Sequence, residues 1–163
     1  MLKRQALITT VIIFLDRCTK WLVVKNIVLD DSVSVLPGFF RLTHLENPGA
    51  AFSVLAESPS PFKTAMLIFF SVAALTVVLT LLWRGRNEFN AATIALSLIL
   101  GGATGNLWDR IADGKVTDFL DFYLGANHWP PFNLADSAIV TGALLLAWKT
   151  ILAPAPGKTR DLM

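Results

Sequence analysis

Two long stretches without a charged residue constrain the fold of this chain more than any other feature. Residues 64–83 supply 20 positions without a charged side chain, and residues 91–108 supply 18 more. A helix that crosses a bilayer needs about 20 mostly apolar residues. Charged residues make up only 16% of the chain, against about 25% in soluble domains, and hydrophobic residues make up 54%. This composition excludes a disordered chain, a disulfide scaffold and a soluble enzyme with a charged surface.

Two further stretches have the length of a span but carry charges. Residues 5–24 include Asp16, Arg17 and Lys20, and residues 134–152 include Asp136 and Lys149. We therefore predict an α-helical integral membrane protein with four transmembrane helices, forming one membrane-embedded domain over the whole chain, residues 1–163. The expected spans are about 5–24, 64–83, 91–108 and 134–152.

The segments between these spans differ in character. Ser32 to Leu45 is rich in Val, Phe and Thr and is interrupted by Pro37-Gly38, which predicts a β-hairpin. We expect this hairpin to form a small β-sheet outside the membrane, within an outer loop that covers residues 25–63. The second outer loop, residues 109–133, is long and polar, and loops of this kind often carry function.

Basic residues predict the orientation of the spans. Residues 1–4, 84–90 and 154–163 hold six Lys and Arg in 21 positions, whereas the opposite segments, 25–63 and 109–133, hold five in 64. Loops rich in Lys and Arg stay in the cytoplasm. We expect both termini to be cytoplasmic and the two longer segments to lie on the outer side.

Polar residues from distant segments converge on this outer side. At about 1.5 Å per helical residue, Asp16 lies near the middle of the membrane and Lys20 about 6 Å further out. The predicted outer ends of the third and fourth spans and the loop between them supply the rest: Asn106, Asp109, Arg110, Asp118, Asp121 and Asp136. Ionisable groups within a membrane are costly, so such a cluster indicates a functional site.

Structural explanations compete with this interpretation. Asp16 and Lys20 are four residues apart on a helix and can neutralise each other. Asp109 and Arg110 can form an interfacial ion pair. Gly101 and Gly105 form a small-residue face whose usual role is close packing of helices.

Carboxylates are the best candidates for chemistry. His44 and His128 lie in predicted loops without partners at metal-ligand spacing, so we expect neither a metal nor another cofactor. No Ser or Cys lies in a nucleophile turn, and no basic stripe suggests nucleic-acid binding. Two carboxylates can hydrolyse an amide when one is ionised and activates water while the other, protonated, donates a proton. Asp118 and Asp136 are suitably placed, with Asp109 and Asp121 as rivals.

Two other classes of protein fit the same residues. A small proton-coupled transporter could use intramembrane aspartates as a relay. The clustering of the acids at one end of the spans argues against it, because a relay needs steps on both sides. A lipid-binding scaffold without chemistry is the third possibility, and it would tolerate replacement of Asp118.

Five motifs, in order along the chain, resemble the lipoprotein signal peptidases (signal peptidase II). They are Asp16-Arg17-Cys18-Thr19-Lys20, Asn47-Pro48-Gly49-Ala50-Ala51-Phe52, residues 101–110 (GGATGNLWDR), residues 116–122 (VTDFLDF) and residues 129–137 (WPPFNLADS). The resemblance covers most of the chain. Arg17, where an uncharged residue is expected, and Glu46, which precedes the second motif, depart from the pattern and leave the charge balance near the site open.

The resemblance implies an aspartyl intramembrane endopeptidase of the bacterial inner membrane. Such an enzyme removes the signal peptide of diacylglyceryl-modified prolipoproteins on the N-terminal side of the lipidated cysteine, near the periplasmic face. It implies Asp118 and Asp136 as the catalytic pair. The implied substrate-binding or supporting residues are Asn47, Gly49, Asn106, Arg110, Asn133, Asp16 and Lys20. It also implies that the hairpin cradles substrate and that loop 109–133 clamps it. The expected partners are lipidated prolipoproteins and membrane lipid, and we expect a monomer.

The charge asymmetry yields a first prediction. A cysteine at position 87, introduced as Asn87→Cys, should be protected from a membrane-impermeant thiol reagent in intact cells and should react after the membrane is permeabilised. The reason is the high density of Lys and Arg in segment 84–90, which holds it in the cytoplasm. Labelling from the periplasmic side would reverse the orientation and the depths assigned above.

Overall fold

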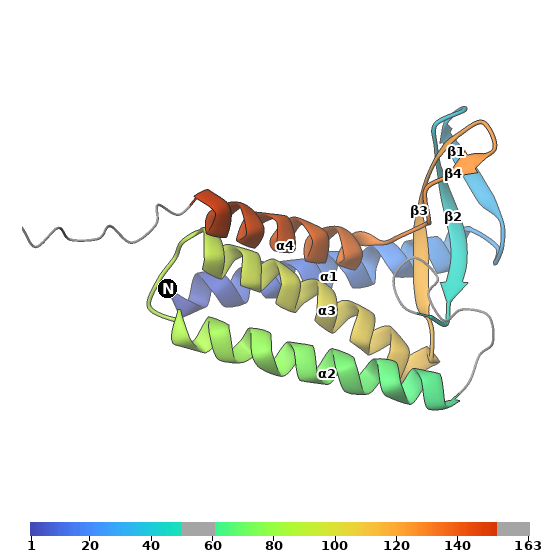
Figure 1. Ribbon diagram of the computed structural model, residues 1–163. Helices are drawn as coiled ribbons and strands as arrows, with labels where there is room; N and C mark the ends of the chain where they lie inside the picture. The colour runs from blue at the N-terminus through green and yellow to red at the C-terminus, as the bar shows by residue number, and fades with distance from the viewer. Residues whose placement is uncertain (50–60, 153–163) are drawn as a thin grey trace, which may run out of the picture.

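The structure, a computed structural model, describes residues 1–49 and 61–152. Within these ranges the chain forms a bundle of helices with a small antiparallel sheet at one end (Figure 1). In chain order the elements are α1 (Leu2–Asn26), β1 (Ser32–Leu36), β2 (Phe40–Asn47), α2 (Pro61–Arg84), α3 (Ala91–Asp113), β3 (Val116–Leu124), β4 (Asn127–His128) and α4 (Leu134–Leu152).

Three helices of the described ranges are long and apolar enough to cross a membrane: Pro61–Arg84, Ala91–Asp113 and Leu134–Ile151. They coincide with three of the predicted spans. The first predicted span is also a continuous helix, α1, but Asp16, Arg17 and Lys20 exclude it from this apolar class. The mainly helical class and the small sheet are therefore confirmed, and the fourth crossing stays a prediction.

α3 is the centre of the bundle, because it packs against α1, α2 and α4. Glycines permit this close approach. A Cβ atom on Gly101 would lie 2.8 Å from Cβ of Ile12 in α1, and one on Gly102 would collide with the carbonyl oxygen of Ala135 in α4. The small-residue face of α3 therefore has the packing role that was expected of it.

α3 is longer than predicted. Asn90 begins it with a capping box, in which the Asn90 side chain accepts from the Thr93 amide and the Thr93 hydroxyl accepts from the Asn90 amide. The helix ends at Asp113 instead of residue 108, and Gly114 follows in the left-handed conformation, with φ of 73°. Asp109 and Arg110 continue the helix because each has partners inside the protein, so their charges do not end it.

The sheet has the strand order β1-β2-β3-β4. The predicted hairpin is confirmed, since β1 and β2 pair antiparallel with Val33 opposite Leu42. Within the predicted outer loop 109–133, residues 116–124 form β3, which pairs with β2 and was not predicted. Nine residues of the segment expected to clamp substrate therefore lie in the sheet, and the clamping role stays a prediction. His44 and His128 likewise lie in β2 and β4 and not in loops.

Apolar contacts join the sheet to the bundle. Phe119 of β3 packs with Val23 and Ile27 near the end of α1. The other end of the bundle contains Met1, the turn between α2 and α3, and the end of α4 (Figure 1). Gln5, fully buried, ties this end together by donating to the carbonyl oxygens of Gly85 and Glu88.

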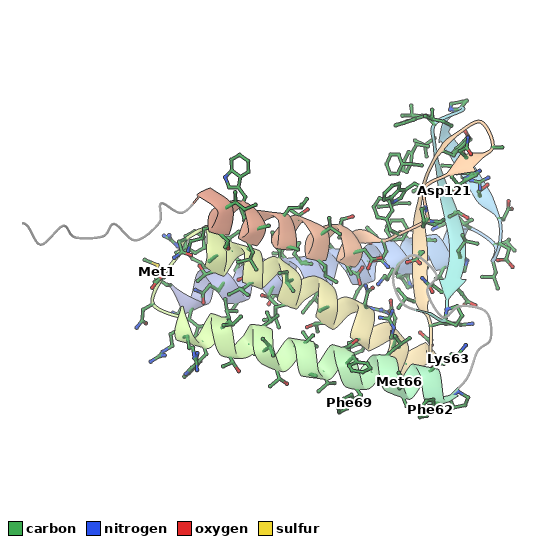
Figure 2. The ribbon with its side chains drawn as sticks, in the orientation of Figure 1. Met1, Phe62, Lys63, Met66, Phe69 and Asp121 are labelled. Atoms are coloured by element: carbon green, nitrogen blue, oxygen red, sulfur yellow. The ribbon has the colours of Figure 1, made fainter. Side chains whose placement is uncertain are left out.

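α2 is the outermost helix and exposes large apolar side chains. Phe62 is 72% exposed and Phe69 is 67% exposed, and both project from α2 on the side away from the other helices (Figure 2). Such a surface is typical of a helix in contact with lipid. Parts of the predicted features, namely Ala50-Ala51-Phe52 of the second motif and the basic residues Lys158 and Arg160, lie outside the described residues.

The contact at Gly102 yields a second prediction. Gly102→Ala should lower the free energy of unfolding by about 1–3 kcal/mol, because the added methyl group meets a main-chain oxygen that cannot move independently of α4. Thr104→Ala, two residues further along the same helix, is the matched control and adds no atom. Thermal unfolding of both variants in detergent tests this, and an unchanged melting temperature for Gly102→Ala would contradict the close packing.

Candidate active site

Asp118 and Asp136 are brought together by one residue, Asn133. Its side-chain Nδ2 donates to Asp118 Oδ1 at 2.8 Å, and its Oδ1 accepts from the main-chain amide of Asp136 at 2.9 Å. Asn133 is completely buried between β3 and the start of α4. The two carboxylates therefore share a rigid connection although they come from different elements.

The start of α4 explains the position of Asp136. Asn133 is the residue before the helix, and its amide donates in return to Asp136 Oδ2 at 3.3 Å. This reciprocal pair is a capping box, which satisfies main-chain donors that the helix leaves free. The carboxylate of Asp136 also lies at the positive end of the helix dipole, which favours a negative charge. Asn106 of α3 donates to its other oxygen at 2.7 Å.

Asp118 is 5% exposed and both of its oxygens accept hydrogen bonds from amides. Asn47 Nδ2, at the end of β2, donates to Oδ2 at 3.0 Å, and Asn133 Nδ2 donates to Oδ1. The pKa of Asp118 is raised to about 6, chiefly because burial disfavours the charged form. The hydrogen bonds from Asn47 and Asn133 oppose this shift, and the charge of Asp136 adds to it. The environment thus favours a proton on Asp118 at mildly acidic pH.

Lys20 occupies a buried position between α1 and α3. Its Nζ lies 2.9 Å from Asp16 Oδ2, 2.7 Å from Asp109 Oδ2 and 3.0 Å from Asn106 Oδ1. Asp16 in turn accepts from the main-chain amide of Ala135, next to Asp136, at 3.1 Å. The expected pairing of Asp16 with Lys20 is present, but both residues also reach α3 or α4.

Arg110 lies between α3 and the end of β2. Its Nη2 donates to the carbonyl oxygen of Gly49 at 3.0 Å, and the amide of Gly49 donates to Asn47 Oδ1 at 2.8 Å. The Nε of Arg110 is buried and has no hydrogen-bond partner among the described residues. The expected ion pair between Asp109 and Arg110 is absent there, because Asp109 pairs with Lys20 and Arg17.

The rival carboxylates have other partners. Asp109 is held by two cations, as described above. Asp121 is completely buried, accepts from Arg41 Nε at 2.6 Å and lies 2.9 Å from His128 Nδ1. Asp121 marks the sheet end of the molecule in Figure 2, opposite Met1. The association of Arg41, Asp121 and His128 was not predicted, since its members lie on three strands that only the fold brings together.

The two departures from the family pattern each have a partner of opposite charge. Arg17 pairs with Asp109, and its guanidinium lies 5.9 Å from the centre of the Trp108 ring. Glu46 of β2 pairs with Lys115, the residue directly before β3. Each of these two charges is therefore paired with a neighbouring opposite charge, and neither residue contacts Asp118 or Asp136.

The described part of the chain contains no group of three or more His, Cys, Asp or Glu residues that could hold a metal ion. A cavity of about 790 Å³ opens beside Arg110, between the start of α2, the end of α3 and the end of β2. Residues that line it include Glu46, Pro61, Thr64, Ile68, Arg110 and Lys115. It combines an apolar wall with a charged rim, which suits an amphipathic ligand.

Solved structures with this fold define the class of protein. Two of them, both described as bacterial membrane enzymes, superpose with TM-scores of 0.80 and 0.78 at 26% and 28% sequence identity. The first match covers 99% of this chain and 95% of the other, and the second covers 94% and 95%. The bundle with its terminal sheet is thus the fold of bacterial membrane enzymes.

Sequence relatives define the family. The family described as Signal peptidase (SPase) II matches residues 8–152. A lipoprotein signal peptidase of Solibacter usitatus is 48% identical over 139 residues, or 85% of each chain. One of Desulforapulum autotrophicum is 43% identical over 155 residues, which is 95% of this chain and 96% of the relative. The chain belongs to the signal peptidase II family, and is accordingly a membrane protein and a peptidase.

Proposed function

We propose that this chain is an aspartyl endopeptidase that cleaves signal peptides from diacylglyceryl-modified prolipoproteins. The observation that carries the proposal is the link from Asp118 through Asn133 to Asp136, which holds two carboxylates in unlike surroundings. Asp118 is buried with a raised pKa, and Asp136 lies at a helix N-terminus. A buried carboxyl that can hold a proton, beside a second carboxylate, is what metal-free hydrolysis of an amide requires.

The reaction follows from these surroundings. Ionised Asp136 takes a proton from water, whose oxygen attacks the scissile carbonyl, and protonated Asp118 gives its proton to the carbonyl oxygen. The resulting diol collapses when Asp136 returns its proton to the leaving nitrogen and Asp118 removes one from a diol hydroxyl. The carbon–nitrogen bond breaks, and both carboxyls regain their initial states. Arg110 and Asn47, beside the pair, are suited to hold the main chain of the substrate.

We place the protein in the bacterial inner membrane with α1 as a fourth span. The buried charges of α1 face α3, whereas Leu7, Phe14 and Trp21 are 63%, 64% and 58% exposed, as expected for a helix surrounded by lipid. Lys3, Arg4 and Arg84 lie at the end of the bundle opposite the sheet. The positive-inside rule puts that end in the cytoplasm and the site near the periplasmic face.

The substrate reaches the site from the membrane in this scheme. The cavity beside Arg110 gives an amphipathic segment access to the outer end of the bundle. The acyl chains of the modified cysteine stay in lipid, where each buried CH₂ group contributes about 0.8 kcal/mol. Cleavage then falls on the N-terminal side of that cysteine, at the depth of the carboxylates. One chain contributes the whole set of site residues, so a monomer suffices.

The alternatives lose their support. Membership of a peptidase family argues against a proton-coupled transporter and against a scaffold without chemistry. No contact among the described residues favours either of them specifically.

Replacement of either carboxylate tests the proposal. Asp118→Asn and Asp136→Asn should each lower cleavage by about 10²–10⁴-fold, because an amide can neither take a proton from water nor donate one as an acid. The double variant should be no slower than the singles, since the pair acts as a unit. The measurement is the gel shift of a lipidated precursor incubated with purified protein in detergent.

Asp30→Asn is the matched control, because Asp30 is an exposed carboxylate in the turn before β1 and is not among the residues that line the cavity. It should retain wild-type rates. Thermal unfolding of every variant establishes that loss of cleavage is not loss of structure. Cleavage near the wild-type rate by folded Asp118→Asn or Asp136→Asn would transfer the catalytic role to other residues.

The raised pKa of Asp118 predicts the pH profile. The value of kcat/KM should fall as pH rises through about 6, because Asp118 loses the proton that it donates. Asn47→Ala removes a donor that stabilises the charged form, so the pKa of Asp118 rises and the decline moves to higher pH. Asn26→Ala, an exposed asparagine of α1, should leave the profile unchanged. A decline that does not move in Asn47→Ala would contradict the assignment of Asp118 as the acid.

A further inference from the structure

Asn106 lies between a cation and a carboxylate. Its Oδ1 accepts from Lys20 Nζ at 3.0 Å, and its Nδ2 donates to Asp136 Oδ1 at 2.7 Å. Asn106 is 6% exposed and Lys20 is 2% exposed, so bulk water does not compete for these bonds. A continuous chain of hydrogen bonds therefore leads from α1 through α3 to Asp136.

The chemistry of the amide gives this chain a direction. A side-chain amide carries an acceptor and a donor at nearly equivalent positions and can exchange them by a half turn about its last bond. An ammonium group has three donors and no acceptor. Lys20 therefore favours the orientation in which the oxygen of the Asn106 side chain faces it. That orientation directs the NH₂ group to Asp136. Without the ammonium, a reversed amide would set oxygen against the carboxylate.

The surroundings of Lys20 hold it in this role. Its other two contacts are a hydrogen bond to the carboxylate of Asp16 and an ion pair with that of Asp109. Arg17 pairs with the second oxygen of Asp109, which keeps that carboxylate in place from the rim of the cluster. Lys20 thus has a fixed position and one remaining contact, the amide of Asn106.

We infer that Lys20 is a positioning residue for the reaction and acts on Asp136 through the side chain of Asn106. It orients and polarises the amide whose N–H holds Asp136 ready to receive the proton of water. This role goes beyond neutralisation of Asp16, for which the contact with Asn106 would be unnecessary. The inference rests on the proposed peptidase activity.

Kinetics of Lys20→Met test the inference. Met keeps the length of the side chain and removes the ammonium. With a lipidated precursor peptide over a range of concentrations, kcat should fall about 10- to 100-fold while KM changes less than about threefold, because Asp136 is displaced and the substrate contacts are not. In an Asn106→Ala background the same substitution should lower kcat less than threefold further, since the residue through which Lys20 acts is gone.

Two additional variants separate positioning from charge balance. Asp16→Asn combined with Lys20→Met removes one positive and one negative charge and preserves the net charge of the cluster. The kcat should stay low in this double variant, which also serves for the kinetics if Lys20→Met alone does not fold. Lys25→Met is the matched control, because it makes the same substitution at an exposed lysine of α1 that lies over the Trp21 ring, away from the cluster. Its kcat should stay within about twofold of wild type.

Several outcomes would overturn the inference. They are a wild-type kcat in folded Lys20→Met, recovery of kcat in the charge-matched double variant, and full additivity of Lys20→Met with Asn106→Ala. Failure of the unsubstituted protein to cleave the precursor would instead reject the proposed function. The two failures are therefore distinguishable in one set of measurements.

Discussion

The structure depends on the requirement that charges inside an apolar bundle have partners. A charged side chain at the centre of a membrane helix costs about 3 kcal/mol even after adjustment of its surroundings. Here Asp16, Lys20 and Asp109 meet this requirement collectively at the contact of α1 with α3. Small residues make the meeting possible, because a Cβ atom on Gly105 would lie 2.5 Å from the carboxylate of Asp16. The close packing of α1 against α3 and the pairing of the buried charges therefore depend on each other.

The same contact extends to the site. Asp16 accepts from the amide of Ala135, and Lys20 reaches Asp136 through Asn106, so α1 influences the start of α4 by main chain and side chain. Asp118 comes from the opposite direction, on a strand whose core contacts fix the sheet to the end of α1. The two carboxylates consequently experience different surroundings, one buried among amides and the other at a helix N-terminus. Such a difference separates acid from base in a carboxylate pair.

Local signals in the sequence predicted the elements, and long-range pairing limited the prediction of the site. Long, mainly apolar stretches located the helices, and the Asn133-x-x-Asp136 spacing is a capping signal visible in the sequence. β3 was missed although its residues are β-branched and aromatic, because the aspartates within it suggested a polar loop. The partners of Asp109 lie on another helix, so adjacency to Arg110 was misleading. The motifs shared with the lipoprotein signal peptidases selected candidate site residues among those that spacing alone left open.

The division of the two carboxylates between sheet and bundle has a consequence for how this chain matures. Asp118 belongs to β3 and Asp136 to α4, and Asn133 connects them only after the segment following β3 has returned to the bundle. A chain whose last helix has not yet been inserted has half of the pair and no Asn133 to hold it. Under the proposed mechanism, hydrolysis becomes possible only after α4 has been inserted, so a nascent chain is an inert precursor until that step.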